Sequence, residues 1–504
     1  MEWGSGITYI GETHLKGQLV KFGIKDADRA SHLAVVGKAG SGKPALVVNM
    51  AVQDILRGRG VLVVDSMGSI TQSLLERIPK DARERVIFLD PSDGEYPYSW
   101  NPLNDFENAY REGPERALER LAELLAGMYK FNAPKLAEFI ASQLLLRTDA
   151  TLVFFYTLVT DANARNKFLP QASDARTRFE ELLEAYPDAA HAIAENGKYL
   201  AKDTMMRNIL GQQDSKFNFE GLRRDAIIIA NLSRIRMFPT RITPLVRLYV
   251  SAARLSALEE SPTAIYLHDC LRYFSPEEFE KAIFDHSVTL TFSDTSHGEE
   301  EKTLRHAALQ RAGSVISFLP HETDIHAVER IFYPYVPLEK FEKLEGGEYV
   351  IALSIDGVRS RPFFARTLPL PERTGISPRD LELESRRNYA ITRLKADALF
   401  IPRHDEADKG IKPEDPGSFS NAFRSIFTKR AGASDAPAGK PASFQTIAPP
   451  APQNAPSQPA EKPVAFSPTK SFGVDEKKVP KSQPAEEISE EELKKMLHVG
   501  RPPQ

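Results

Sequence analysis

The sequence predicts an α/β protein built on a doubly wound, mainly parallel β-sheet, with an all-helical insertion inside the sheet domain and a disordered tail behind it. Short apolar runs rich in valine and isoleucine recur between residues 1 and 372, and helical segments separate several of them. Unbroken apolar runs are typical of strands that are covered on both faces, as in parallel sheets. Their alternation with helices indicates a doubly wound arrangement.

Seven apolar runs, each bounded by a turn or helix signal, are the predicted strands. The segment "PALVVNMAVQDILRGR", between the first two runs, has the apolar spacing of an amphipathic helix. Near the end of the domain, "GEYVIALSIDG" and "SRPFFARTL" alternate apolar and polar residues and predict a closing hairpin. The seven runs span residues 32–37, 60–65, 85–90, 226–231, 264–269, 288–293 and 314–319.

The stretch between the third and fourth runs differs from the rest of the folded region. "ERALERLAELLAGMYK" and "APKLAEFIASQLLL" carry apolar residues at three- and four-residue spacing, and no convincing strand run lies beside them. We therefore predict an all-helical insertion over residues 105–205, which divides the sheet domain into residues 1–104 and 206–372. Residues 373–403 are expected to form a linker or helical extension.

The composition changes after residue 404. Fifteen of the 36 prolines lie in residues 404–504, where aliphatic clusters are scarce. Such a segment buries too little apolar surface to offset its chain entropy, which predicts disorder. The stretch "EEISEEELKKMLHV" predicts one short helix near residues 489–498. This helix is either transient and solvated or a peptide that folds on a partner protein.

Composition excludes several kinds of function. A net charge of −4 and a pI near 6.3 give no global attraction to nucleic acid, so any such binding requires a local basic patch. The single cysteine, Cys270, excludes an intrachain disulfide and makes a cysteine-based zinc site implausible. With no run of eighteen apolar residues and no secretory pattern at the N-terminus, the expected location is the cytoplasm.

The stretch "VVGKAGSGKP", residues 35–44, follows the pattern G-x-x-x-x-G-K-[ST] for seven positions and departs from it at the eighth. In such a loop, backbone N–H groups at a helix N-terminus surround a phosphate and the lysine neutralises its charge. An apolar strand before it and an amphipathic helix after it favour this interpretation over a plain glycine-rich turn. The candidate nucleotide-binding residues are Gly37, Lys38, Ala39, Gly40, Ser41, Gly42, Lys43 and Pro44; residues 37–43 are called the glycine loop below.

Pro44 stands where the pattern requires serine or threonine. Proline has no hydroxyl to bind Mg²⁺ and no N–H to donate to a phosphate. It also disfavours helical backbone at Lys43, the residue before it. Because proline is tolerated in a first helical turn, we expect the fold to survive and hydrolysis to suffer.

A second strand supplies the acid that such a site requires. In phosphate-loop enzymes a separate strand ends in an aspartate that helps to hold Mg²⁺. The run "AIYLHDC" offers Asp269 for this role, although an aspartate at a strand end is often only a turn or cap residue. The next residue, Cys270, cannot replace the glutamate that would polarise water. Asp65 ends another strand and is a second candidate metal ligand, so we expect both acid-bearing strand ends at the glycine loop.

The glycine loop, the acid-bearing strands and the segments around them, taken in their order along the chain, resemble the FtsK/HerA-like DNA-pumping ATPases. The resemblance is strongest to the TraD/TraG-like coupling proteins of type IV secretion and conjugative DNA transfer. The resemblance extends from residue 8 to about 372 through "TYIGETHLKGQLVKFGIKDADRASHLAVVGKAGSGK", "GRGVLVVDSMGSITQSLLERIP" and "GSVISFLPHETDIHAVERIF". It implies a RecA-like motor domain that binds ATP and Mg²⁺ and forms a hexameric ring around DNA. It also implies an arginine that reaches the neighbouring subunit's nucleotide, for which Arg305 and Arg311 are candidates.

The departures from the family lie at the nucleotide pocket. Besides Pro44 and Cys270, "DSMGS" lacks the second acid of the family's usual stretch, and "SDTSHGEE" (residues 293–300) lacks its glutamine. These changes favour a degenerate copy, a structural or regulatory subunit that works beside an intact paralogue and meets the inner membrane only through partners. A working ATP-driven DNA translocase and a pure interaction scaffold that recruits a partner through its terminal helix are the alternatives.

One basic segment is a candidate DNA contact. "RIRMFPTR", residues 234–241, follows a predicted strand and carries Arg234, Arg236 and Arg241. Arginines in a loop at the end of a strand can bind phosphates of the DNA backbone, although a solvated loop would have the same composition.

Overall fold

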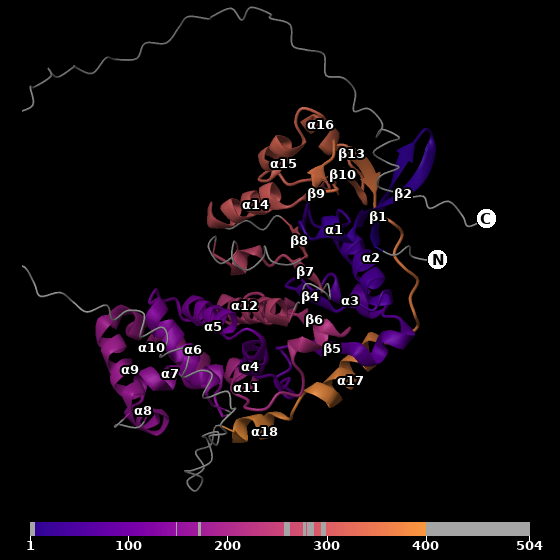
Figure 1. Cartoon of the computed structure of the whole chain (residues 1–504). Coiled ribbons are helices and arrows are strands. Elements are labelled where there is room, and N and C mark those ends of the chain that lie inside the picture. The colour runs from indigo at the N-terminus through magenta and orange to yellow at the C-terminus, as the bar shows by residue number, and fades with distance from the viewer. Residues whose placement is uncertain are drawn as a thin grey trace, which may run out of the picture. The chain divides into compact units, whose positions relative to one another are not determined.

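The computed structural model describes residues 6–147, 149–169, 173–256, 263–275, 279, 287–293 and 299–399 (Figure 1). The predicted tail over residues 404–504, with its short helix near 489–498, lies outside the described residues. So do residues 294–298 of the segment that departs from the family's glutamine-containing stretch. Among the described residues, no helix is both long enough and apolar enough to span a membrane.

All seven predicted strands form, and they lie side by side and parallel in the order β9-β3-β8-β7-β4-β6-β5. β3 lies between β9 and β8, with Val36 opposite Phe292 of β8 and Ser317 of β9. The predicted α/β fold class is therefore confirmed. The bounds are β3 (Leu33–Val36), β4 (Val61–Asp65), β5 (Val86–Leu89), β6 (Ile227–Asn231), β7 (Ala264–His268), β8 (Val288–Phe292) and β9 (Ser314–Ser317).

Antiparallel strands extend this sheet beyond β9 to 11 strands. β10 (Glu348–Ala352) pairs with both β9 and β13 (Phe363–Arg366), which confirms the closing hairpin. The short strands β11 (Ser354–Ile355) and β12 (Val358–Arg359) form a separate ladder in the connection. At the edge, β1 (Ile7–Leu15) and β2 (Gln18–Lys25) form an N-terminal hairpin that the apolar runs did not indicate.

Helices cover the sheet, and the one that follows the glycine loop is anchored at its far end. At its far end Asp54 accepts two hydrogen bonds from Arg29, at 2.7 and 3.0 Å, and both side chains are buried. This ion pair joins the helix to the chain that enters β3. The helices around the sheet are α1 (Asp26–Arg29), α2 (Lys43–Leu56), α3 (Thr71–Leu75), α12 (Pro239–Ser256), α14 (Glu299–Arg311), α15 (Ile325–Phe332) and α16 (Leu338–Phe341).

Residues 105–205 carry helices, as expected from their spacing, and these pack on one another and on α12 (purple in Figure 1). The boundaries of this region as a domain remain a prediction. The helices are α4 (Pro102–Glu112), α5 (Pro114–Tyr129), α6 (Pro134–Leu145), α7 (Leu152–Thr160), α8 (Ala162–Phe168), α9 (Asp174–Ala185), α10 (Pro187–Lys202) and α11 (Thr204–Leu210).

An aromatic cluster closes the base of the insertion. Trp100 is fully buried, and its ring lies 5.1 Å from that of Phe219 and 5.4 Å from that of Tyr249. The indole N–H donates to Asp105 Oδ2 at 2.7 Å, while the Phe219 N–H donates to Asp105 Oδ1 at 2.6 Å. Asp105 therefore connects the chain that enters the insertion to the chain that leaves it.

The stability of the protein should depend on the protonation of Asp105. Burial raises the pKa of its carboxyl group to about 7, above the value near 4 of an unfolded aspartate. The folded state thus keeps a proton that the unfolded state releases, so stability falls as pH rises from about 4 to 7, by up to about 4 kcal/mol. Urea unfolding near pH 5 and near pH 8 should show this loss in the wild type and a smaller one in Asp105→Asn, with the exposed Asp188→Asn as control. Equal pH dependence in both proteins would contradict the prediction.

Residues 373–399 are packed against the sheet domain and do not form a free linker. α17 (Pro378–Tyr389) lies beside β5, where the Ser385 hydroxyl accepts a hydrogen bond from the Phe88 N–H at 2.7 Å. α18 (Arg393–Ala398) contacts α11, and its Asp397 forms an ion pair with Arg207 at 2.9 Å. The helical character expected for this stretch is therefore present.

Candidate phosphate-binding site

The glycine loop lies between β3 and the first turn of α2, the strand–loop–helix context that the motif requires. φ is 77° at Gly40 and 121° at Gly42, values that side-chain-bearing residues rarely adopt. A Cβ atom on Gly42 would lie 3.0 Å from the Phe318 ring and 3.1 Å from the Gly347 Cα atom. Only glycine fits this close approach, so the loop keeps the tight curvature of a phosphate-binding turn.

The interior of the loop is polar and buried. The Lys43 side chain is 1% exposed, and its ammonium donates hydrogen bonds to the carbonyl oxygens of Gly37 and Lys38. The Ser41 hydroxyl is buried, and no described residue forms a hydrogen bond with it. Leaving a buried hydroxyl unsatisfied costs about 1–3 kcal/mol, which a ligand that accepts its hydrogen bond would recover. The residues present therefore fit a phosphate group.

The charge of Lys43 depends on two acidic neighbours. Burial lowers the pKa of its ammonium to about 8, while the negative charges of Asp269 and Asp324 act to raise it. Asp269 follows β7 and Asp324 precedes α15, so acids from both sides of β3 lie within electrostatic reach of the glycine loop. Below about pH 8 the loop therefore carries a cation.

Pro44 is the second residue of α2, and the helix forms around it as predicted. The two helical turns that follow are buried against the sheet, so the missing amide of Pro44 does not prevent the helix from packing. Pro44 offers a ligand neither a hydroxyl nor an N–H group.

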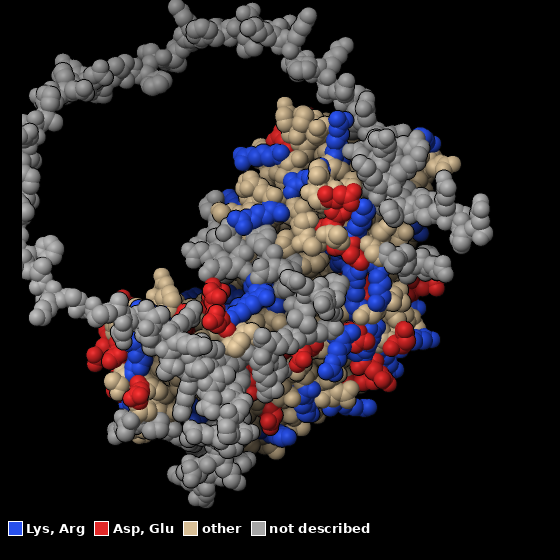
Figure 2. All heavy atoms as spheres, viewed as in Figure 1, with Lys and Arg blue, Asp and Glu red and all other residues tan. Residues whose placement is uncertain are grey.

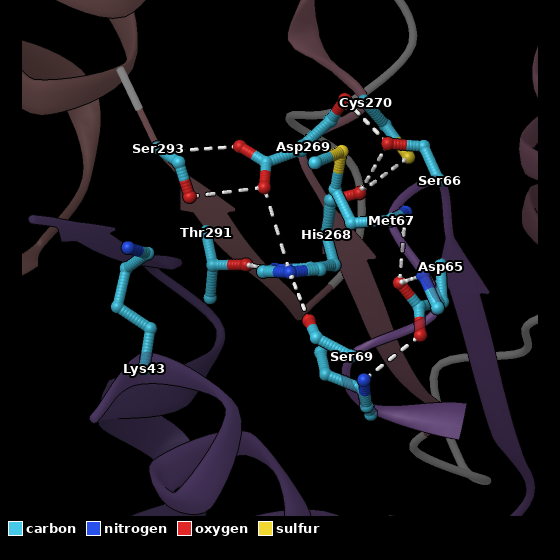
Figure 3. Close-up of polar contacts among 12 residues, drawn as sticks. Lys43, Asp65, Ser66, Met67, Ser69, His268, Asp269, Cys270, Thr291 and Ser293 are labelled. Carbon is cyan, nitrogen blue, oxygen red and sulfur yellow. Dashed lines mark hydrogen bonds and ion pairs between the residues drawn. The ribbon is translucent and has the colours of Figure 1, made fainter. Parts of the chain in front are cut away.

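Asp269 lies at the tip of β7 with its carboxylate already engaged (Figure 3). Its Oδ1 atom accepts a hydrogen bond from the Ser293 N–H at 2.5 Å, and its Oδ2 atom accepts one from the Ser293 hydroxyl at 3.1 Å. The backbone at Asp269 is left-handed, with φ of 53°, which turns the carboxylate toward the end of β8. Both oxygens thus have donors from the protein itself, in place of a metal ion.

A histidine that the sequence analysis did not select belongs to the same network. The His268 Nε2 atom lies 2.8 Å from the Ser69 Oγ atom and 3.4 Å from Asp269 Oδ2. Its Nδ1 atom lies 2.5 Å from Thr291 Oγ1 (Figure 3). The ends of β7 and β8 and the turn after β4 are therefore joined by polar side chains around one carboxylate. The position of His268 directly before Asp269 was the only signal in the sequence that could have indicated this histidine.

The thiol of Cys270 has no route to catalysis. Cys270 is buried, and its Sγ atom lies 3.2 Å from the His268 carbonyl oxygen and 3.5 Å from that of Val64. Burial raises the pKa of the thiol well above its usual range, so it stays neutral and cannot act as a base.

The Asp65 carboxylate is engaged by its own turn, and its role as a metal ligand stays a prediction. β8 and β7 separate β3 from β4, and Asp65 lies at the end of β4. Its oxygens accept hydrogen bonds from the backbone N–H groups of its own turn, at Gly68 (2.7 Å) and Thr71 (2.8 Å) among others. This geometry favours a structural role, shaping the turn into α3, because a short carboxylate saturated by amides has no oxygen left for a metal.

The two arginines considered for a neighbouring subunit's nucleotide differ in position. Arg305 is buried within its own subunit and donates to both carboxylate oxygens of Asp324, at 2.8 and 2.9 Å. Arg311 is exposed near the start of β9, at the sheet edge opposite to the glycine loop. Arg311 as a residue that acts on a neighbouring subunit remains a prediction.

The basic segment predicted to contact DNA lies between β6 and α12 and spans η3 (Ser233–Ile235). Arg234 is 73% exposed and forms a 3.3 Å ion pair with Asp90, and Arg236 is also exposed. Arg241 is held by Asp203 at 2.7 Å and is less available. Met237 and Phe238 between them are exposed as well. Elsewhere, Figure 2 shows basic and acidic side chains interspersed on the visible face, in agreement with the small net charge.

Among the described residues, no group of three or more histidine, cysteine, aspartate or glutamate side chains could hold a metal ion. Mg²⁺ usually takes only one or two carboxylates and completes its shell with phosphate oxygens and water. Asp269 is the carboxylate whose position best matches that of a magnesium ligand. Its hydrogen bonds to Ser293 would have to break before it could bind the metal.

The sheet order and the loop define the class of protein, a RecA-like α/β phosphate-loop fold. No protein-family model matches the chain, and no curated protein matches it. Among solved structures it is similar to the bacterial conjugative coupling protein TrwB in its unbound form, at 15% identity and a TM-score of 0.48, over 70% of this chain and 87% of that one. TrwB with a non-hydrolysable ATP analogue gives 16% identity, a TM-score of 0.48 and coverage of 70% and 89%. The chain is also similar to VirB4 of Thermoanaerobacter pseudethanolicus, at 13% identity and a TM-score of 0.45, over 74% of this chain and 98% of that one.

Proposed function

We propose that this chain is a phosphate-loop protein of a DNA-transfer complex that binds nucleotide through its glycine loop but hydrolyses ATP poorly or not at all. It would serve as a structural or regulatory subunit beside an intact paralogue. One observation carries the proposal: the loop retains its curvature, a buried Lys43 and an unsatisfied Ser41 hydroxyl, while Pro44 and Cys270 stand at the positions that magnesium-dependent hydrolysis requires.

Binding and hydrolysis make different demands on the loop. A phosphate would take the N–H groups of the glycine loop, the Lys43 ammonium and the Ser41 hydroxyl, which are present, while the N–H of position 44 is missing. Mg²⁺, when bound, would stabilise the charge that develops on the transferred phosphoryl group. Here the position of its usual hydroxyl ligand is Pro44, and no acid follows Asp269 to polarise water. Removing a single preorganised donor costs about 100- to 1000-fold in turnover, so these changes together should leave little hydrolysis.

DNA is the proposed macromolecular ligand. Support comes from the exposed arginines Arg234 and Arg236, which follow β6 at the same sheet edge as the glycine loop. Exposed Phe238 beside them offers a ring on which a base can stack. The assembly would be a homo- or hetero-hexamer in the cytoplasm, attached to the inner membrane through other secretion-system subunits.

Titration with a fluorescent ATP analogue, with and without Mg²⁺, tests the proposal. We expect saturable binding whose affinity changes little when Mg²⁺ is added, because the protein offers the metal no hydroxyl ligand. We also expect no phosphate release above background when DNA is added. Magnesium-dependent binding with DNA-stimulated phosphate release would instead identify a working translocase. No binding at all would identify an interaction scaffold, and either result would overturn the proposal.

A further inference from the structure

The shape of the glycine loop is set partly by residues outside the motif. The Lys38 N–H donates to the Leu319 carbonyl oxygen at 2.8 Å, and the Gly347 N–H donates to the Ser41 carbonyl oxygen at 2.9 Å. The Phe318 ring lies against Gly42. Residues 318–324 connect β9 to α15, and we call them the β9 loop. Its first two residues form one wall of the glycine loop.

A buried ion pair anchors the far end of the β9 loop. Asp324 stands at the N-terminus of α15, and Arg305 of α14 donates to both of its carboxylate oxygens. The Arg305 side chain is 2% exposed and the Asp324 side chain is 7% exposed. A two-pronged contact of this kind fixes orientation as well as distance. Glu301, one turn earlier in α14, lies 3.3 Å from the same guanidinium but is not part of the β9 loop.

The pair also determines the charge beside the phosphate position. The Asp324 charge reaches Lys43, since it acts to raise the pKa of that ammonium. An unbalanced carboxylate at this place would repel a phosphate, and water cannot screen it in a buried site. Arg305 supplies the compensating positive charge.

We propose that Arg305 is a positioning residue for nucleotide binding in its own subunit. By pairing with Asp324 it keeps the β9 loop folded against the glycine loop and cancels a negative charge beside Lys43. The inference rests on the proposed function, and it assigns Arg305 a role within its subunit in place of one on a neighbour's nucleotide.

Substitutions of the two partners should shift nucleotide affinity in opposite directions. Arg305→Gln removes the positive charge that pairs with the Asp324 carboxylate and should weaken binding of the fluorescent ATP analogue by about 10-fold or more. Arg305→Lys keeps the charge and should restore part of the affinity. Asp324→Asn keeps the shape and one acceptor oxygen but removes one of the negative charges beside Arg305, so the local charge becomes more positive and binding should tighten. Glu301→Gln is the matched control and should leave affinity close to that of the wild type.

A second measurement, made without nucleotide, tests whether Arg305 keeps the β9 loop against the glycine loop. Hydrogen exchange of the Lys38 amide, which is bonded to Leu319, should accelerate in Arg305→Gln and stay unchanged in Glu301→Gln. Unchanged exchange in Arg305→Gln would overturn the positioning role. Weaker binding in both Arg305→Gln and Asp324→Asn would show a merely structural pair and overturn the charge role. A wild type that binds no nucleotide would overturn the proposed function and the charge role with it, whereas the exchange measurement would still decide the positioning role.

Discussion

Lys43→Met should remove most nucleotide binding while leaving the fold as stable as before or slightly more stable. Hydrogen bonds from a charged donor contribute about 1.5–3 kcal/mol, so the loss should be about 10- to 100-fold in affinity. Methionine fills a similar volume, and the buried ammonium of Lys43 has its pKa lowered because burial disfavours its charge. A fluorescent ATP analogue and a thermal melt would measure the two effects separately.

The same residue makes binding depend on pH. Since the pKa of Lys43 is lowered to about 8, the cation is lost as pH rises through that value, and wild-type affinity should fall there. Lys38→Met is the matched control, because it removes a neighbouring charge from the loop but keeps the backbone N–H bonded to Leu319. If Lys43→Met bound the analogue as tightly as the wild type, the glycine loop could not be the nucleotide site.

The strands of the parallel sheet were predictable because each is an unbroken apolar run, and burial on both faces requires such a run. The order of the strands was not, since it depends on which crossovers pack together and not on any single segment. The N-terminal hairpin β1–β2 escaped notice because its strands alternate or mix polar and apolar residues, as in "QLVKFGIK". Such a pattern suits an edge strand, which is covered less completely than a central one.

The candidate site also has parts that could be predicted from the sequence and parts that could not. The glycine loop was predictable because its contacts lie within one short segment. The bonds from Ser293 to Asp269 and from Arg305 to Asp324 join residues 24 and 19 positions apart. The first follows from the adjacency of the ends of β7 and β8, and the second from the contact between α14 and α15. The role of Asp65 is hard to predict for a related reason. The sequence alone does not distinguish a strand-end aspartate that faces a ligand from one that caps its own turn, and here four residues of the turn donate five hydrogen bonds to the carboxylate.

The two departures from the motif are not equivalent once their surroundings are known. Pro44 lies at the open start of α2, where other side chains can be accommodated, whereas Cys270 is 1% exposed beside carbonyl oxygens. A glutamate at position 270 would place a buried carboxylate beside two carbonyl oxygens, and a buried charge that is poorly compensated costs several kcal/mol. Reversal of the first change should therefore be tolerated better than reversal of the second.

Pro44→Thr should make nucleotide binding magnesium-dependent and about 10-fold or more tighter in the presence of the metal, because it returns both a hydroxyl ligand and a backbone donor. Pro44→Ala is the matched control: it returns only the N–H, so its affinity should rise modestly and show no response to Mg²⁺. Neither variant should release phosphate, since Asp269 keeps its bonds to Ser293 and Cys270 remains neutral. Adding Cys270→Glu to Pro44→Thr should lower the unfolding free energy and still give no turnover. Robust hydrolysis by the double variant would mean that the pocket needs only those two side chains, and that the hydrogen bonds around Asp269 yield readily to a metal.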